Sequence, residues 1–389
     1  MYQKIQQFNL NNQRVLIRED FNVPMQQSVI TDDTRIRSAL PTIQLALKQK
    51  ARVILMSHLG RPIEGEYDPR FSLKPVAKKL SEYLNQPIPL ITNWIDGVVA
   101  QPGDVVLCEN VRFQPGEKKC DEALSKKMAH LCDIFVMDAF ASAHRREAST
   151  AGVAHYAKIA CAGLLLDAEL TALSKALMHS EKPLVAIVGG AKVSTKFQAL
   201  EHLLRIVNVL IVGGGIANTL LKAQGFSIGQ SLYEAEWVSR AQQLLIMAKE
   251  KQIIMPLPTD VVVAKTFSAE AIASIKSVKQ VATDDMILDI GPETAAHYAD
   301  LLKTAKTIIW NGPVGVFEFP AFAHGTKILA EAIANSAAFS IAGGGDTIAA
   351  IAQCQVRDKI NYISTGGGAF LEWMEGKTLP AIETLAKFV

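Results

Sequence analysis

The sequence lacks several features that mark common classes of protein. Its 389 residues carry 40 basic and 38 acidic side chains, a net charge of +2, so no basic excess indicates a nucleic-acid partner. The first residues contain no apolar segment of a signal peptide. The longest uncharged apolar stretch, residues 206–221, is interrupted by asparagines and glycines and is too short to span a membrane. We therefore expect a cytoplasmic protein without a nucleic-acid or membrane partner.

Cysteine pairs and several ligand-binding motifs are also missing. The histidines have no H-E-x-x-H spacing, and the P-loop pattern G-x-x-x-x-G-K-[ST] is absent. None of the triple glycines matches the G-x-G-x-x-G of dinucleotide folds. The five cysteines lack C-x-x-C spacing and are odd in number, which predicts reduced thiols; they are Cys108, Cys120, Cys132, Cys161 and Cys354.

Double and triple glycines are absent from the first half of the chain. They occur only after residue 188, each behind a short apolar run, at 189–190, 213–215, 343–345 and 366–368. In the first half the apolar runs end instead in polar and charged residues, as in Ser57-His58-Leu59-Gly60-Arg61. Glycine lets backbone N–H groups approach a phosphate, whereas arginine holds an anion through its side chain. The two halves therefore predict two anion sites of different chemistry, and so a two-substrate enzyme.

Short β-branched runs alternate with amphipathic segments of helical period. Apolar strands that alternate with helices predict parallel sheets covered on both faces, and about eleven strands overfill one open sheet. We therefore predict an α/β fold of two doubly wound parallel-sheet domains, with a linking helix near residues 163–170. The expected strands are 15–17, 53–56, 105–107, 134–137, 184–188, 209–212, 261–263, 286–290, 307–310, 339–342 and 362–364; helical segments include 73–84, 168–177 and 238–249.

Basic side chains follow the expected strands of the first half. Ligands of open α/β sheets bind beyond the carboxyl ends of the strands, so these side chains could converge on one small anion with more than one negative charge. A surface salt bridge explains any one of these arginines more simply, but five at strand ends favour the anion site. The two histidines are equally well explained as structural hydrogen-bonding groups. The residues at these positions include Arg18, Asp20, Asn22, Arg35, His58, Arg61, Arg112, Asp138, His144 and Arg145.

In the second half, the glycine turns predict a phosphate site. Lys192 and Lys196 follow Gly189-Gly190 at four-residue spacing, so we expect them to share one face at the start of a helix. Asp346 begins a second strand-to-helix turn, where it either caps the helix or holds Mg²⁺ beside a nucleotide. The rigid loop 311–318 is either the wall of a nucleoside pocket or a structural turn.

Taken together, these motifs closely resemble the phosphoglycerate kinase family of the bacterial type, from end to end. The matching stretches are Asp20-Phe-Asn-Val-Pro24, Ser57-His-Leu-Gly-Arg-Pro62, Glu109-Asn-Val-Arg-Phe113, Ala143-His-Arg145, Gly189-Gly-Ala-Lys-Val193, Asn311-Gly-Pro-Val-Gly-Val-Phe-Glu318, Gly343-Gly-Gly-Asp-Thr347 and Ser364-Thr-Gly-Gly-Gly-Ala369.

The resemblance implies two Rossmann-like domains joined by a hinge helix. Residues 1–165 would form the phosphoglycerate-binding domain, residues 166–371 the nucleotide-binding domain, and a tail of residues 372–389 would pack back on the first. The implied reaction is reversible phosphoryl transfer from 1,3-bisphosphoglycerate to MgADP, giving 3-phosphoglycerate and MgATP as the domains close. In the reverse direction the attacking carboxylate of 3-phosphoglycerate is already ionised at pH 7, which agrees with the absence of a recognisable His–Asp dyad. The resemblance also implies a monomer.

By the same resemblance, Arg35 and Lys192 are the catalytic pair and Asp346 binds Mg²⁺. The implied phosphoglycerate-binding residues are Asp20, Phe21, Asn22, Arg35, His58, Leu59, Gly60, Arg61, Arg112 and Arg145. The implied nucleotide-binding residues are Lys196, Gly213, Gly214, Asn311, Pro313, Val316, Glu318, Gly344, Gly345, Asp346 and Thr347. The chain departs from the family pattern at Thr195, at Arg146-Glu147 and at His324, which leaves local contacts open.

Two functions of other classes are the alternatives. One is a two-domain protein that closes on a small anion without chemistry, against which the second, glycine-lined site counts. The other is an NAD-linked dehydrogenase, against which the missing dinucleotide motif counts.

Overall fold

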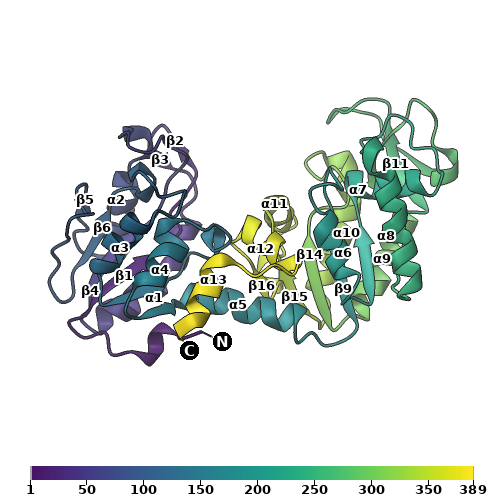
Figure 1. The fold of residues 1–389 in the computed structure, drawn as a ribbon. Coiled ribbons are helices and arrows are strands. Elements are labelled where there is room, and N and C mark those ends of the chain that lie inside the picture. Colours follow the sequence, from purple (N-terminus) through teal and green to yellow (C-terminus); the bar gives the residue numbers. More distant parts are fainter. Residues whose placement is uncertain (1, 389) are drawn as a thin grey trace. The chain divides into compact units, whose positions relative to one another are not determined.

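The computed structural model describes residues 2–388, which fall into two compact units (Figure 1). The first unit comprises the chain up to residue 171 and the segment from residue 378 onward; the second comprises residues 172–377. These divisions lie a few residues beyond the predicted positions 165 and 371. Helix α5 (Leu164–Leu177) runs across the first division, where the sequence predicts a linking helix.

The first unit contains a six-stranded parallel sheet in the order β5-β6-β4-β1-β7-β8. Its strands are β1 (Arg14–Arg18), β4 (Arg52–Met56), β5 (Leu90–Ile91), β6 (Val105–Cys108), β7 (Ile134–Met137) and β8 (Ala160–Ala162); a hairpin of β2 (Met25–Gln26) and β3 (Val29–Ile30) lies outside it. In β1 the side chains of Val15 and Ile17 belong to a core shared with two helices, while Leu16, of opposite parity, is buried outside that core. Both faces of the sheet are therefore covered.

The helices of the first unit form two groups. Helices α1 (Thr34–Lys48) and α2 (Lys74–Leu84) contribute Ile36, Ile43 and Leu80 to the core that contains Val15. Helix α3 (Glu122–His130) contacts α4 (Val153–Tyr156) and the π-helical turn Ala148–Gly152. The C-terminal helix α13 (Pro380–Leu385) packs on α4 and on the same turn (Figure 1).

The second unit contains a five-stranded parallel sheet in the order β10-β9-β14-β15-β16. Its strands are β9 (Leu184–Val188), β10 (Val209–Val212), β14 (Thr307–Asn311), β15 (Phe339–Ala342) and β16 (Tyr362–Ile363). Its helices are α6 (Phe197–Leu203), α7 (Gly214–Ala223), α8 (Val238–Glu250), α9 (Pro292–Lys303), α10 (His324–Ala334), α11 (Gly345–Gln353) and α12 (Gly367–Met374). The two parallel sheets with their helices confirm the predicted α/β fold class.

Two of the predicted strands do not belong to a parallel sheet, which corrects the prediction for 261–263 and 286–290. They form β11 (Asp260–Ala264) and β13 (Met286–Ile290), which pair antiparallel and, with β12 (Ser274–Ser277), make a separate three-stranded sheet. Every residue of β11 is buried. An apolar run indicates that a strand is buried on both faces, but it does not predict whether the adjacent strands run parallel or antiparallel.

Each parallel sheet has a point where the chain changes direction along the sheet. In the second unit the chain passes from β9 to β10 on one side and later returns to β14 on the other side of β9. In the first unit β1 is likewise flanked by β4 and β7, which the chain reaches in separate excursions. Such points leave a crevice beyond the carboxyl ends of the central strands, where ligands bind.

Candidate active site

Loops behind three strands of the first unit converge beyond the carboxyl end of its sheet. Asp20, which follows β1, forms an ion pair with Arg35 at the start of α1. The loop after β4 is held from both sides at Gly60, because its N–H donates to Asn22 Oδ1 at 2.9 Å and its carbonyl accepts from Arg112 Nη1 at 2.6 Å. The structure thus brings together side chains that lie far apart in the sequence. We call Arg35, His58, Arg61, Arg112 and Arg145 the basic cluster.

Two guanidinium groups of the basic cluster keep buried donors without a partner. Arg112 is 5% exposed and donates from Nη2 to Glu147 Oε1 at 3.2 Å, yet its Nε has no acceptor among the described residues. Arg145 Nη1 is likewise buried and unpaired within the described part of the chain. Burial, and then the charge of Arg112, lowers the pKa of Arg145. Buried unpaired donors are costly, so a bound anion would relieve the cost at both arginines.

His58 lies at the base of this cluster and is 2% exposed. Burial, followed by the charges of Arg18 and Arg112, holds its pKa well below the ordinary value. The imidazole is therefore neutral at physiological pH.

The remaining predicted residues of this half shape the loops. Phe21 and Leu59 are buried, and the Phe21 N–H donates to Ser57 Oγ at 2.8 Å. Gly60 has φ +61°, and a Cβ there would lie 2.3 Å from the ring of Phe71, so only glycine fits. Arg61 is exposed.

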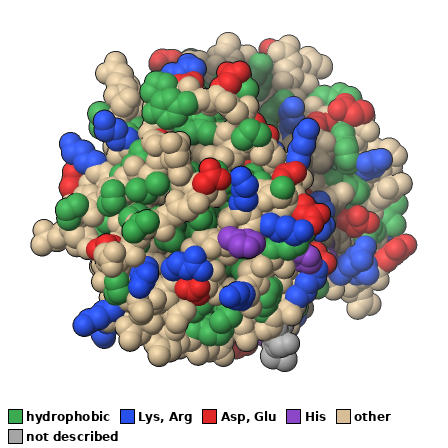
Figure 2. Space-filling view, turned by 60° about the vertical axis from the view of Figure 1, so that its left-hand side comes forward, with side chains coloured by type: hydrophobic (Ala, Val, Ile, Leu, Met, Phe, Trp, Pro, Cys, Tyr) green, Lys and Arg blue, Asp and Glu red, His purple; other side chains and the backbone are tan. Residues whose placement is uncertain are grey.

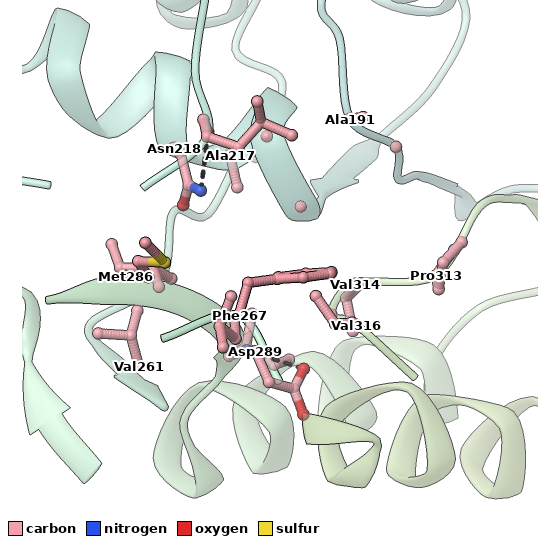
Figure 3. Close-up of a pocket in the computed structure, with 18 of the residues that line it drawn as sticks. Ala191, Ala217, Asn218, Val261, Phe267, Met286, Asp289, Pro313, Val314 and Val316 are labelled. Atoms are coloured by element: carbon pink, nitrogen blue, oxygen red, sulfur yellow. Dashed lines mark hydrogen bonds between the residues drawn. The ribbon is translucent and has the colours of Figure 1, made fainter. Parts of the chain in front are cut away.

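The second unit contains a cavity of about 730 Å³ at the carboxyl end of its sheet. Figure 3 shows Phe267 extending across it, with Met286 and Val261 on one side and Val314 and Val316 on the other. Of the predicted nucleotide-binding residues, the cavity is lined by Gly214, Pro313, Val316, Glu318 and Asp346.

The apolar wall that the antiparallel sheet contributes to this cavity is not predicted from the sequence. Phe267 follows β11 and is 62% exposed, in ring contact with Phe319 at 5.1 Å between centroids. The available signal is an aromatic residue three positions beyond the end of an apolar run, although the sequence predicts that run to lie in a parallel sheet. The antiparallel sheet and the loop after β11 contribute Val261, Phe267, Met286 and Leu288, and Leu232 and Phe319 from other segments complete the wall.

The structure corrects the prediction that Lys192 and Lys196 share a helix face. Helix α6 begins only at Phe197, because Ser194 is held in the preceding turn by hydrogen bonds from its N–H and Oγ to Glu234. Lys192 is exposed in that turn, whereas Lys196 is largely buried.

Lys196 occupies the crevice between β9 and β14. Its ammonium donates to Gly189 O at 2.6 Å and to Asn311 O and Oδ1 at 3.1 and 2.5 Å. Burial lowers its pKa to about 8, although the charge of Asp346 opposes the shift. The Asn311 amide also donates to Gly343 O at 2.8 Å. Lys196 and Asn311 therefore tie three glycine turns together beside the cavity.

The Gly343–Thr347 turn is closed by its own threonine, which also bonds the turn to the loop at Gly312. Thr347 Oγ1 accepts from Gly312 N at 2.7 Å and donates to Gly343 O at 2.8 Å. Gly344 has φ +99°, which favours glycine, and Gly345 is the first residue of α11.

Gly213, at the start of α7, packs against the 311–318 loop. A Cβ there would lie 2.4 Å from Val314 Cα.

Asp346 is the candidate ligand for Mg²⁺. It is exposed in the first turn of α11 at the edge of the cavity. Among residues 2–388, no group of three or more histidine, cysteine, aspartate or glutamate side chains could hold a metal ion. A single carboxylate fits a magnesium ion that is held mainly by substrate phosphates.

The three departures from the family pattern have different surroundings. Thr195 Oγ1 donates to Lys192 O at 2.9 Å, and His324 is the first residue of α10. Glu147 is buried and accepts from Arg112, so this departure belongs to the basic cluster's own contacts, whereas Arg146 is exposed.

On the face shown in Figure 2, basic and acidic side chains are interspersed, in keeping with the near-balanced composition. Within residues 2–388, no helix has the length and apolar character needed to cross a membrane.

The family model and two curated relatives that this chain matches are all phosphoglycerate kinases. The phosphoglycerate kinase family model matches residues 5–377. Phosphoglycerate kinase of Coxiella burnetii is 59% identical over 379 residues, 97% of each chain, and that of Legionella pneumophila is 60% identical over 382 residues, 98% of this chain and 96% of that protein.

Solved structures of the family agree with the fold. The phosphoglycerate kinase structure from Coxiella burnetii matches with a TM-score of 0.97 at 57% identity, covering 100% of this chain and 99% of that one. The enzyme from Pyrococcus horikoshii matches with a TM-score of 0.83 at 32% identity over 99% of this chain and 98% of that one. The chain belongs to the phosphoglycerate kinase family.

Proposed function

We propose that this chain catalyses reversible phosphoryl transfer from 1,3-bisphosphoglycerate to MgADP, giving 3-phosphoglycerate and MgATP. The observation that carries the proposal is a pair of buried guanidinium donors in a cluster of cations, Arg112 Nε and Arg145 Nη1, which have no partner among residues 2–388. Planar guanidinium groups suit the carboxylate and phosphate of phosphoglycerate, because both are flat or branched anions that accept paired hydrogen bonds. The phosphoglycerate would bind to the basic cluster together with Asp20, Asn22 and the loop at Gly60.

The nucleotide would bind in the cavity of the second unit. Its apolar wall around Phe267 and Val316 suits a nucleobase, and Glu318 at its edge can accept hydrogen bonds from ribose hydroxyls. The first N–H groups of the glycine turns, at Gly213, Gly214 and Gly343, donate to backbone carbonyls. The phosphates would therefore bind to the N–H groups that follow, at the starts of α7 and α11. Asp346 would hold Mg²⁺, which supplies charge that neutralises the nucleotide phosphates.

The chemical step needs little from the protein beyond positive charge and exclusion of water. The attacking carboxylate of 3-phosphoglycerate is ionised at pH 7, so no general base is required. We assign the stabilising charge to Arg35 and Lys192, one from each unit. Because the two ligands must meet, we propose that the units close around α5 during turnover. Closure would also protect the acyl phosphate from hydrolysis.

A coupled assay tests this function. The purified full-length protein is supplied with 3-phosphoglycerate and MgATP, and 1,3-bisphosphoglycerate is detected by its reduction with a coupling dehydrogenase and NADH. We expect turnover only when both substrates and Mg²⁺ are present. Tight MgADP binding without turnover would favour a binding protein, and NADH oxidation without the coupling enzyme would favour a dehydrogenase. Sedimentation at working concentration tests the proposed monomer, and fractionation of the producing cells tests the proposed cytoplasmic location.

A further inference from the structure

Arg18 is a fully buried cation to which the proposed chemistry gives no role. It is the last residue of β1 and pairs with Met56 of β4 and Met137 of β7, in the middle of the sheet. Its side chain is 0% exposed. Burying a charge is costly, so a guanidinium at this position requires a set of fixed partners.

The partners of Arg18 fix the orientation of its guanidinium group. Nη1 donates to the carbonyl of Glu19, and Nε donates to Ser149 Oγ at 2.9 Å. Ser149 donates in turn to the buried Glu117, through Oγ to Oε1 and through its N–H to Oε2 at 3.0 Å. The third nitrogen, Nη2, lies 3.2 Å from His58 Nδ1. The group is therefore held from two sides and presents its remaining donor to the histidine.

This contact determines which nitrogen of His58 carries the proton. A guanidinium can only donate, so His58 Nδ1 must accept. The ring is neutral, because burial and the charges of Arg18 and Arg112 keep the pKa of His58 well below its ordinary value. A neutral imidazole whose Nδ1 accepts must carry its proton on Nε2.

The Nε2 proton needs an acceptor that the neighbouring cations cannot supply. Arg35, Arg112 and Arg145 all act on His58 electrostatically, and each offers only donors. An anionic ligand in the basic cluster supplies that acceptor. The ring then adds a directed hydrogen bond to the site without adding a further positive charge.

We infer that Arg18 is a positioning residue, which holds His58 in its Nε2–H form so that the imidazole donates to the bound phosphoglycerate. Ser149 and Glu117 hold Arg18 in the orientation that this requires. The inference rests on the proposed function for the identity of the ligand, but the state of the His58 ring can be tested without any activity.

The first test uses the unmodified, full-length protein labelled with ¹⁵N-histidine. Long-range ¹H–¹⁵N spectra distinguish a protonated from an unprotonated ring nitrogen, and the His58 signals are those lost in His58→Asn. At neutral pH we expect a protonated Nε2 and an unprotonated Nδ1, with or without 3-phosphoglycerate. An Nδ1–H ring, or an imidazolium, would overturn the inference.

The second test compares Arg18→Lys with Arg14→Lys, the same substitution at the other end of β1. Arg14 is partly exposed and paired with Asp133, away from His58. Lysine keeps the charge at position 18 but cannot reach Ser149, the Glu19 carbonyl and His58 together. We expect Arg18→Lys to yield a mixture of His58 ring forms and to raise KM for 3-phosphoglycerate about tenfold. KM for MgATP and the kcat at saturation should change less than twofold, roughly the scatter of such measurements, and Arg14→Lys should match the unmodified protein.

Ser149→Ala is a further variant. It leaves Arg18 and Glu117 in place and removes only the hydrogen-bond acceptor of Arg18 Nε. It should move the His58 signals in the same direction as Arg18→Lys. A raised KM with an unchanged His58 ring would show that Arg18 acts by charge or packing alone, and would overturn the inference. Failure of the proposed function would appear separately, as an unmodified protein that does not turn over 3-phosphoglycerate.

Discussion

At the scale of single residues, cations of this chain act through very different surroundings. Arg112 is buried and donates to Gly60 O and Glu147, and its Nε has no acceptor in the described part of the chain. Lys196 directs its ammonium at three oxygens of the glycine turns. Lys192, four residues earlier, is exposed. The exposed lysine is free to follow a phosphoryl group, whereas the buried one is held in place by the glycine turns.

Arg112→Ala should weaken 3-phosphoglycerate binding by about 2 kcal/mol, roughly 30-fold, because it removes a charge-assisted contact. Nucleotide affinity should stay within the error of the measurement, since Arg112 and the cavity lie in different units. Calorimetric titration of each ligand measures both values, with the exposed Arg70→Ala as control. An equal loss for both ligands would contradict the division into two sites.

Lys192→Ala should lower kcat by about 10²–10³, as expected for the loss of one preorganised donor to the transition state. Because Lys192 is exposed, its removal should leave the stability of the fold unchanged, which thermal unfolding can verify. Steady-state kinetics with both substrates saturating gives kcat, and Lys222→Ala, also exposed, is the control. Near-normal turnover in Lys192→Ala would remove this residue from the mechanism.

At the scale of elements, the glycine turns pack against one another more closely than any side chain allows. A Cβ at Gly189, behind β9, would lie 1.7 Å from Pro313 O, and one at Gly312, behind β14, would lie 2.4 Å from Gly189 O. The two loops therefore pack backbone to backbone at the crevice. Glycine is required there by close approach, as well as by positive φ at Gly312 (+113°).

Gly189→Ala should destabilise the second unit by about 3 kcal/mol, the upper end of the cost of overpacking, because the contact is with backbone that cannot move aside. Urea unfolding measures the change. Gly345→Ala is the matched control, since a Cβ there would meet no atom of the described residues within 4 Å and the residue begins a helix. It should be neutral or slightly stabilising. Equal unfolding midpoints for the two variants would refute the close-approach argument.

Strand β13 contains a carboxyl group that should make stability depend on pH. Asp289 is buried, and burial raises its pKa to about 7 despite hydrogen bonds from Gly325 N and Ile290 N. The folded protein therefore prefers the protonated form. The protonated Asp289 carboxyl contributes its full stabilisation of the fold below pH 4. This contribution, about 4 kcal/mol, is lost as pH rises through 7.

Asparagine cannot ionise, so Asp289→Asn does not lose this stability as pH rises. The unfolding free energy of the variant minus that of the unmodified protein should therefore increase between about pH 4 and 7. The asparagine amide keeps one oxygen acceptor and loses the other, which shifts the unfolding free energy at every pH. The slope of the unfolding free energy with pH is therefore the quantity to compare. Urea unfolding at several pH values measures it, with the exposed Asp284→Asn as control. A difference that stays constant across this range would contradict the buried-carboxyl argument.

At the scale of the whole molecule, each unit has its own core and its own anion chemistry. Guanidinium and imidazole groups line the sheet end of the first unit, and glycine turns with an apolar cavity line that of the second. Each ligand should therefore bind to one unit in the absence of the other.

Hydrogen exchange can test this independence. 3-Phosphoglycerate alone should slow exchange in the loops after β1, β4 and β6, and MgADP alone in those after β9 and β14 and at the start of α11. Mass spectrometry of peptides from the full-length protein resolves these segments. With both ligands present, segments around α5 should also change if the units close. Protection of both sets by either ligand alone would argue against two independent sites.

The sequence alone determined where the predicted strands lie and which residues follow them at the sheet end. All eleven predicted strands occur as strands, and Arg112, His58 and Asp20 lie at the sheet end where the strand order predicts them. Periodicity and side-chain chemistry belong to short segments, so they can be recognised without knowing which segments meet.

Only the tertiary structure decided the rest. The direction of β11 and β13, the burial of Lys196, the Phe267 wall of the cavity and the contact of Arg18 with His58 each depend on segments far apart in the chain. Burial sets the pKa of a lysine or histidine, and a distant hydrogen-bond partner sets which ring nitrogen is protonated. The residue types that carry the chemistry were therefore evident in the sequence, whereas their charge state and orientation follow from packing.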